Sequence, residues 1–313
     1  MKKYLSFIIL AILGLIVIPI LIAQFTKTER RSLQGVRLKD TSFREISFQN
    51  TKQDVNLGGM LFVPEGGGPF PAAVIIHGSG TSHRDSFWYL TLTQYLQENG
   101  IVVLLPDKRG SEQSEGDWRT ASFEDLATDT WAAIAFLKEQ EEVGISIIGV
   151  VGMSQGGHIA PIVASESSDI VFLVDVVGAS VTMHEQLLYE ENHNLRESGV
   201  LPGISNVFAY GTSFLIRTRQ REFWDAIGNF DPIPYWEKLA TSSLVLYGQE
   251  DTNVPSTESA ARLRSLDKLN IEVRIYEDSG HPLEDPVGKG NSVFREDAMK
   301  DIRDFIYSSS GLK

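Results

Sequence analysis

The sequence predicts an α/β fold built on one mostly parallel, doubly wound sheet of eight strands, with a helical lid inserted into it. Two observations carry this prediction. From residue 71 onward, short continuous apolar runs alternate with amphipathic segments, which is typical of buried parallel strands covered by helices on both faces. Between residues 177 and 244 this rhythm is interrupted by some sixty residues without such a run.

The predicted elements follow one another along the chain. Apolar and polar residues alternate through 43–48 and again through 55–63, which predicts an antiparallel strand pair. Six apolar runs then predict parallel strands, and the amphipathic segments predict helices. The strands are expected at 72–76, 101–105, 147–151, 170–177, 244–247 and 271–276, and the helices near 86–98, 122–139, 155–166, 256–268 and 293–307. Functional residues of such a sheet lie at the carboxyl ends of its strands.

The interrupting segment, from about 180 to 240, is rich in Glu, His, Tyr, Phe and Trp and has helical periodicity in places. A structureless loop of this length is uncommon in a compact domain, so we expect an inserted helical lid. The sequence therefore predicts one domain over 27–313, preceded by a separate segment over 1–26.

That first segment contains an apolar run over 7–23, with basic residues on both sides. The run exceeds a signal-peptide core of roughly 7–15 residues and approaches the about 17–25 residues of a spanning helix. We expect a signal anchor that holds the folded domain outside the cytoplasmic membrane. A cleaved signal peptide, which would export the protein to the periplasm or the medium, is the alternative, although Leu21 is a poor residue before a cleavage site after Ala23. A buried core helix is disfavoured because the run is apolar on every face.

Composition excludes several classes of function. The 313 residues suffice for one large core, and the net charge of −13 argues against a nucleic-acid partner, because binding to a polyanion depends on clustered Lys and Arg. The chain has no cysteine, which excludes disulfides, thiolate metal sites and a Cys nucleophile. The histidines lack acidic or histidine neighbours at ligand spacing, so no metal site and no cofactor is predicted.

The segment Gly152-Met153-Ser154-Gln155-Gly156 lies between a predicted strand and a predicted helix. In this context a GxSxG sequence indicates a sharp turn that projects the serine hydroxyl above the sheet, with glycines where a side chain would clash. Free N–H groups at the start of the helix stabilise negative charge beside the serine. Ser154 is therefore the candidate nucleophile, and the Gln155 amide is a candidate oxyanion donor.

A second oxyanion donor is expected in the loop after the strand at 72–76, which reads His77-Gly78-Ser79-Gly80. We assign this role to the Ser79 amide, because the flanking glycines let the backbone turn toward a substrate carbonyl. An ordinary tight turn is the alternative. His77 is interpreted as structural.

A serine nucleophile needs a base, and position separates the six histidines. His281 follows the last strand in the turn Asp278-Ser279-Gly280-His281-Pro282, so it can reach over the carboxyl edge of the sheet. His158 lies on the helix that leads away from Ser154 and is interpreted as a packing or capping residue, whereas His184 and His193 belong to the lid.

The third member must be a carboxylate that orients the imidazole and stabilises its cation. Glu250 and Asp251, after the strand at 244–247, both suit this role. The order of serine, acid and histidine along the chain is the order found in α/β-hydrolases.

Charged residues also follow the strand ends at Arg84-Asp85 and at 107–110. We interpret them as loop ion pairs rather than substrate contacts. The glycines at 66–68, which precede Pro69, are interpreted as a turn between strands, without the helix that phosphate binding requires.

From about residue 40 to the C-terminus, the chain resembles bacterial α/β-hydrolases of the dienelactone-hydrolase-like and prolyl-oligopeptidase-related esterase group. The segments that carry the resemblance are 77–80, 84–85, 107–110, 152–157, 248–255 and 280–281; the lid contributes almost nothing to it. The resemblance implies a triad of Ser154, Asp251 and His281. Met153 stands where relatives often carry histidine, and the cysteine nucleophile of true dienelactone hydrolases is absent.

The resemblance also implies hydrolysis of carboxylic esters, with a small-molecule ester as substrate. A serine peptidase acting on short peptides and a thioesterase are the alternatives that the same residues allow. A non-catalytic binding protein on a hydrolase fold is a further alternative, because fold alone does not establish activity.

Overall fold

The computed structural model describes residues 32–311. Its main sheet has eight strands in the order β2-β3-β5-β4-β6-β7-β8-β9, and all neighbours are parallel except the β2–β3 and β3–β5 pairs. The strands are β2 (Arg44–Asn50), β3 (Val55–Phe62), β4 (Phe70–Ile76), β5 (Val102–Pro106), β6 (Ile145–Met153), β7 (Ile170–Val176), β8 (Ser242–Gly248) and β9 (Ile271–Tyr276). The predicted eight-stranded, mostly parallel sheet is confirmed.

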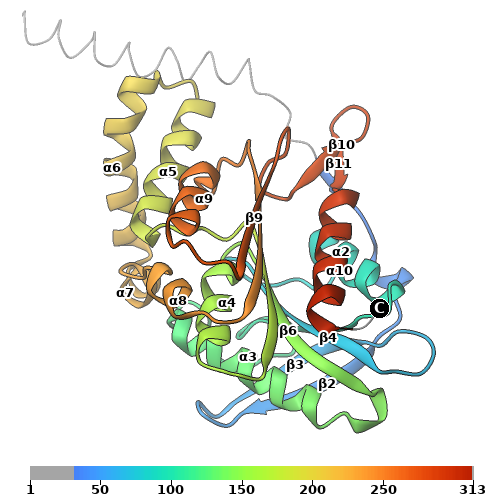
Figure 1. Cartoon of the computed structure of the whole chain (residues 1–313). Coiled ribbons are helices and arrows are strands. Elements are labelled where there is room, and N and C mark those ends of the chain that lie inside the picture. The colour runs from blue at the N-terminus through green and yellow to red at the C-terminus, as the bar shows by residue number, and fades with distance from the viewer. Residues whose placement is uncertain (1–31, 312–313) are drawn as a thin grey trace, which may run out of the picture.

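Helices cover both faces of this sheet (Figure 1). One face packs against α3 (Phe123–Lys138), α4 (Gly156–Ser165) and α9 (Ser256–Ser265), and the other packs against α2 (Phe87–Glu98) and α10 (Glu296–Ser310). Short 3-10 helices, η1 (Leu38–Asp40) and η2 (Glu141–Val143), lie in connections. The five helices agree with the predicted ranges to within a few residues at each end, which is the usual uncertainty of a helix boundary.

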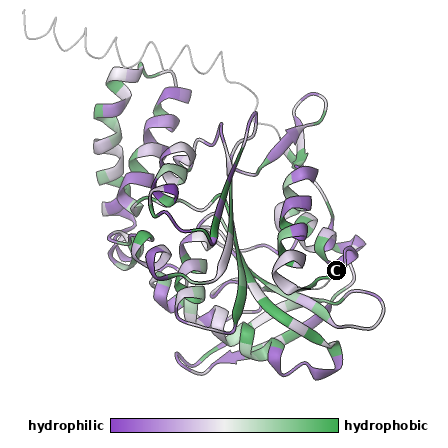
Figure 2. Ribbon diagram, viewed as in Figure 1, coloured by the Kyte–Doolittle hydropathy of each residue, from purple (hydrophilic) through white to green (hydrophobic). Residues whose placement is uncertain are grey.

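The continuous apolar runs of the sequence follow from burial of the sheet on both faces. In β4, Ala72, Val74 and Ile76 contribute to the core under α3 and α4. The alternate residues Ala73 and Ile75 contribute to the core under α2 and α10. Successive side chains of a strand point to opposite faces, so every position of a doubly covered strand is apolar. Figure 2 shows hydrophobic residues along the central strands and hydrophilic residues on outer helix faces.

A second, small sheet was not predicted. It joins β1 (Ser32–Gln34), β10 (Glu284–Pro286) and β11 (Asn291–Phe294), in the order β1-β11-β10. Its strands are three or four residues long and include charged residues and a proline. Such strands have no apolar period and form through tertiary pairing.

The segment between β7 and β8 contains four helices, α5 (Met183–Glu197), α6 (Pro202–Arg219), α7 (Arg221–Ile227) and α8 (Ile233–Lys238). In Figure 1, α5 and α6 run side by side at one edge of the molecule. The predicted segment over 1–26 lies outside the described residues. Within residues 32–311, no helix is long and apolar enough to cross a membrane.

Candidate active site

Ser154 lies in the turn between β6 and α4, at the carboxyl edge of the sheet. Its φ of +54° is in the left-handed region, which non-glycine residues adopt at an energetic cost. Its backbone N–H donates to Val176 O at 2.8 Å, which fixes the turn to β7. This strained turn places the hydroxyl at the surface of the sheet, where Ser154 is partly exposed.

The two glycines of the turn are required by close backbone approach. A Cβ on Gly152 would lie 2.4 Å from Gly156 O, and a Cβ on Gly156 would lie 2.1 Å from Ile76 O. Both distances are far below van der Waals contact. Any side chain at these positions would displace the backbone that holds Ser154.

The predicted base and acid meet Ser154 at this edge. The loop after β9 brings His281 Nε2 to 2.9 Å from Ser154 Oγ, and the loop after β8 brings Asp251 Oδ2 to 2.8 Å from His281 Nδ1. In the tautomer that these contacts favour, the Ser154 hydroxyl donates to Nε2 and the Nδ1–H donates to the carboxylate. Ser154 and His281 are 127 residues apart in the chain, and Asp251 and His281 are 30 residues apart. The parallel sheet brings the three side chains together.

Asp251 is buried, and its second oxygen is also occupied. Oδ1 accepts the backbone N–H groups of Asn253 at 2.7 Å and Val254 at 2.9 Å. Hydrogen bonds of this kind stabilise the ionised carboxylate. The neighbouring Glu250 is exposed, so of the two acids that the sequence left open, the structure brings Asp251 to the histidine.

The imidazole of His281 lies in an acidic environment. Burial lowers its pKa, but the charge of Asp251, its hydrogen bond, and the nearby carboxylates Glu190 and Glu284 outweigh burial, so the pKa is raised above 6.5. Burial in turn raises the pKa of both Glu190 and Glu284. The surroundings therefore stabilise the imidazolium relative to the neutral ring, and the imidazolium is the form that a base adopts after taking a proton from serine.

The predicted oxyanion donors also lie beside Ser154. A Cβ on Gly78 would be 3.2 Å from the Ser154 Cβ, so the loop that carries Ser79 is in contact with the nucleophile. The Gly78 N–H donates to Tyr89 Oη at 2.8 Å, which fixes this loop to α2. Within residues 32–311, the amides of Ser79 and Gln155 have no protein acceptor, so both are available to a substrate oxygen.

The other histidines lie in different surroundings. His77 is buried and its Nε2 contacts Pro106 O at 2.7 Å. His158 is fully buried, with its ring stacked on Phe123. Burial lowers the pKa of each to about 4, so both are neutral packing residues. His184 and His193 lie on α5.

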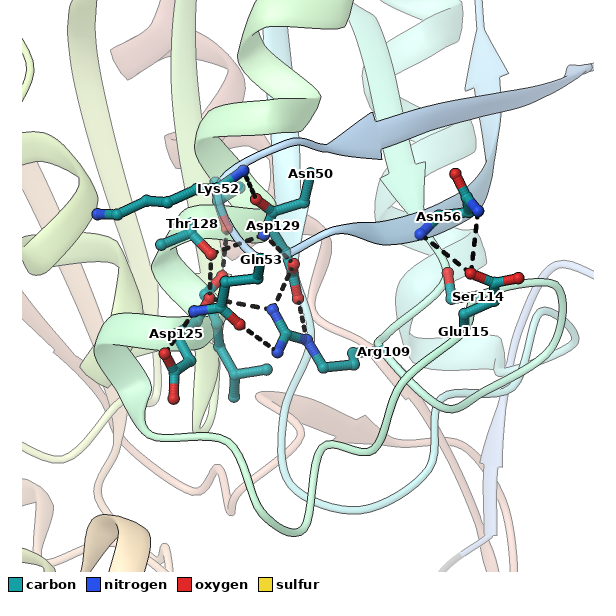
Figure 3. A network of polar contacts seen from close by, with 12 residues as sticks. Asn50, Lys52, Gln53, Asn56, Arg109, Ser114, Glu115, Asp125, Thr128 and Asp129 are labelled. Atoms are coloured by element: carbon teal, nitrogen blue, oxygen red, sulfur yellow. Dashed lines mark hydrogen bonds and ion pairs between the residues drawn. The ribbon is translucent and has the colours of Figure 1, made fainter.

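Some of the loop charges predicted to form ion pairs do so, whereas Asp85 is exposed and no ion pair of its side chain is found within residues 32–311. Arg84 pairs with Asp107 at 2.7 Å, and Arg109 pairs with Asp129 at 2.7 Å. Figure 3 shows the network around Arg109, in which Gln53 also accepts from its guanidinium. Lys108, between these two paired residues, has no carboxylate partner within residues 32–311. Sequence reasoning grouped it with the loop ion pairs.

Helix α5 of the lid contacts the loop that carries the acid. Tyr189 Oη donates to Asp251 O at 2.7 Å, and Asn253 Nδ2 donates to Glu190 Oε1 at 3.4 Å. These contacts were not predicted, because the lid contains no motif. The acid loop is therefore positioned partly by the lid.

A metal centre has no counterpart in the described part of the chain: no group of three or more His, Asp and Glu side chains within residues 32–311 is placed to hold an ion.

Comparison with known proteins places this geometry among hydrolases. Esterase EstD from Thermotoga maritima is 26% identical over 262 residues, which cover 79% of this chain and 63% of EstD. Acyl-coenzyme A thioesterase 3 from Mus musculus is 25% identical over 242 residues, covering 72% of this chain and 50% of that protein. The chain thus spans between half and two thirds of the length of these relatives.

Solved structures share the fold. The Pyrococcus furiosus esterase Pf2001 superposes with a TM-score of 0.65 at 18% identity, covering 91% of this chain and 99% of that one. The family model "BAAT / Acyl-CoA thioester hydrolase C terminal" matches residues 131–288, just over half of the 313 residues. The matched range contains Ser154, Asp251 and His281. The chain is thus an α/β-hydrolase superfamily protein and belongs to the BAAT / acyl-CoA thioester hydrolase C-terminal family.

Proposed function

We propose that this protein is a serine hydrolase that cleaves carboxylic esters through Ser154, His281 and Asp251. One observation carries the proposal: His281 lies within hydrogen-bond distance of Ser154 Oγ through Nε2 and of Asp251 through Nδ1. A nucleophile in contact with a base that is itself oriented by an acid is the arrangement required for nucleophilic catalysis.

In the proposed reaction, His281 Nε2 takes the hydroxyl proton while Ser154 Oγ attacks the ester carbonyl carbon. The carbonyl oxygen becomes an oxyanion that accepts hydrogen bonds from the amides of Ser79 and Gln155. The tetrahedral intermediate collapses, the C–O bond to the alcohol breaks, and His281 donates its proton to the leaving alkoxide. Water, deprotonated by His281, then attacks the acyl-enzyme and releases the carboxylic acid and free Ser154.

Asp251 acts on the imidazole throughout this cycle. It holds the tautomer in which Nε2 is free to accept the serine proton, and its charge stabilises the imidazolium that forms. The two backbone N–H groups that donate to its other oxygen fix the direction of the carboxylate.

A thioesterase is the second candidate, because the matched family and one relative are named for acyl-CoA thioester hydrolysis. The charges near the base favour simple esters. Glu190 and Glu284 both act on His281, and the chain carries a net charge of −13. Coenzyme A thioesters carry several phosphate charges, which these carboxylates would repel.

Substrate competition in one assay tests the preference. The kcat/KM for a neutral p-nitrophenyl ester is compared with that for the acyl-CoA of the same acyl chain, at low and high salt. The ester is expected to be the better substrate, and salt should improve the acyl-CoA reaction by screening repulsion. An acyl-CoA preference at low salt would make the thioesterase the function. Ser154→Ala should abolish both reactions, and activity equal to wild type would support a non-catalytic triad.

A serine peptidase is tested in the same way with aminoacyl p-nitroanilides. We expect their turnover to be far below that of the esters. Turnover of amides matching that of esters would overturn the proposal in favour of a peptidase.

We further propose that the segment over 1–26 anchors the protein in a membrane, with the folded domain outside the cytoplasm, or exports it. The apolar run over 7–23 supports this. On α6, the side chains of Val207, Tyr210 and Phe214 are 65–71% exposed, and the helix contains no acidic residue. An exposed apolar helix face without acidic residues is compatible with a nearby lipid surface. Membrane fractionation with protease accessibility in intact cells tests the location, and a protein found in the soluble cytoplasmic fraction would contradict it.

A further inference from the structure

Lys108 is a buried cation beside the candidate active site. It follows β5, and the residue is 8% exposed. Its Nζ donates to Gly78 O at 2.8 Å and to Gln155 Oε1 at 2.8 Å. The same Nζ lies 4.8 Å from the ring centroid of Trp118. Its two hydrogen-bond partners belong to the two segments that carry the candidate oxyanion donors.

The backbone of Lys108 is held on both sides. Asp107 forms two hydrogen bonds with the Arg84 guanidinium, at 2.8 and 2.7 Å, and Arg109 is fixed by Asp129 in the network of Figure 3. The Lys108 N–H itself donates to Ser82 Oγ at 3.1 Å. These contacts place the side chain in one position, which is what a positioning role requires.

Peptide geometry connects Lys108 to the Ser79 amide. The carbonyl of Gly78 and the N–H of Ser79 belong to the same planar peptide, in which a trans bond points the two groups in opposite directions. Because Lys108 holds Gly78 O, it fixes the direction of the Ser79 N–H away from itself. The same ammonium holds the Gln155 side chain, and the Gln155 backbone N–H is the other candidate donor.

Within residues 32–311, no carboxylate pairs with the Lys108 ammonium. Burial lowers its pKa to about 7. The adjacent Asp107 pairs with Arg84, and the adjacent Arg109 pairs with Asp129. Burying a cation without a carboxylate is unfavourable for folding, and such groups cluster at functional sites. A negative charge that develops on the far side of the Gly78–Ser79 peptide would provide the missing compensation.

We propose that Lys108 is a positioning residue of the oxyanion hole, which aims the Ser79 and Gln155 amides and polarises the Gly78–Ser79 peptide toward the developing oxyanion. This inference rests on the proposed hydrolase function. It predicts that Lys108 acts on the transition state and has little influence on binding of the ground-state ester.

Lys108→Met tests the proposal, because methionine keeps an unbranched side chain beside Trp118 and removes the donors and the charge. We expect kcat to fall about 10²-fold, at the lower end of the loss on removing an oxyanion donor, while KM changes less than about threefold. The inhibition constant of a trifluoromethyl ketone analogue, whose adduct carries the oxyanion, should rise by the same factor as kcat/KM falls.

Two further variants complete the experiment. Lys108→Gln keeps an N–H donor without the charge and should lie between wild type and Lys108→Met in both kcat and analogue affinity. Lys52→Met is the matched control, because Lys52 also lies over a tryptophan ring, Trp131, at 5.4 Å, and its ammonium points away from the network in Figure 3. It should leave kcat and analogue affinity unchanged.

Several results would overturn the proposal. One is a Lys108→Met protein with the kcat of wild type. Another is a Lys108→Met protein in which only KM rises or only thermal stability falls. Analogue affinity that stays constant while kcat falls would also exclude an effect on the oxyanion. A Ser154→Ala protein that remained fully active would instead refute the proposed function, so the two failures are distinguishable.

Discussion

Asp175 offers a quantitative test of how the fold supports the nucleophile turn. This residue lies inside β7, opposite Gly152 of β6 in the sheet, and is fully buried. Its Oδ1 accepts the Gly178 N–H at 2.8 Å, and its Oδ2 has no partner within residues 32–311. A Cβ on Gly157 would lie 2.1 Å from Asp175 Oδ1, so this carboxyl group packs directly beneath the start of α4.

Burial raises the pKa of Asp175 from 3.8 to about 7, against the opposing effect of the Gly178 hydrogen bond. Between these values the folded protein binds a proton that the unfolded protein has released, so the stability of the folded state falls as pH rises through this window. The difference between a pKa of 3.8 and one of about 7 corresponds to ~4 kcal/mol of stability, because a tenfold change in proton affinity is worth about 1.4 kcal/mol. The penalty is fully present above about pH 7 and absent below about pH 4.

Asp175→Asn removes this titration and keeps an oxygen for the Gly178 N–H. The free energy of unfolding of both proteins is measured by urea denaturation at pH 4 and pH 8. The free energy of unfolding of the variant, relative to that of wild type, should be ~4 kcal/mol more favourable to folding at pH 8 than at pH 4. Any pH-independent penalty of the new amide cancels in this comparison. Identical pH dependence in the two proteins would refute the reasoning.

Two further predictions concern the site. Glu190→Gln should move the acidic limb of the kcat/KM profile to lower pH, because it removes a carboxylate that raises the pKa of His281. Asp225→Asn removes an exposed charge on α7 and should leave the limb unchanged; equal profiles for both variants would contradict the argument. Gly156→Ala should lower kcat at least tenfold and destabilise the fold by about 1–3 kcal/mol, because the new Cβ would lie 2.1 Å from Ile76 O. The control Gly203→Ala should leave kcat unchanged, because no atom lies within 4 Å of its new Cβ. Full activity in Gly156→Ala would show that the turn tolerates a side chain.

The main sheet was predictable because its strands are buried on both faces, which leaves continuous apolar runs in the sequence. β10 and β11 were not, because Glu284–Pro286 and Asn291–Phe294 are short, lack an apolar period and form only by pairing with each other and, for β11, with β1. The lid helices were predictable as a class but not as individual elements, since their periodicity is partial. Helix α6 in particular exposes large apolar residues, whereas prediction from a hydrophobic pattern assumes that apolar residues are buried.

Within the site, the meeting of Ser154 and His281 was predictable from their places after strand ends, whereas the choice of Asp251 over Glu250 needed the resemblance. Lys108 was missed, because a lysine between an aspartate and an arginine looks like part of an ion-pair network. Only the structure shows that both neighbours are paired elsewhere. Asp175 did carry a signal, as a lone acid within an apolar strand run.

The central claim is that Ser154 is a nucleophile activated by His281. The most direct measurement is mass spectrometry of the protein after reaction with a fluorophosphonate, which labels activated serines covalently. We expect a single adduct mapped to the peptide that contains Ser154, loss of the adduct in Ser154→Ala, and slow labelling in His281→Ala. Absence of an adduct at Ser154, or equal labelling of Ser154→Ala and wild type, would contradict the account.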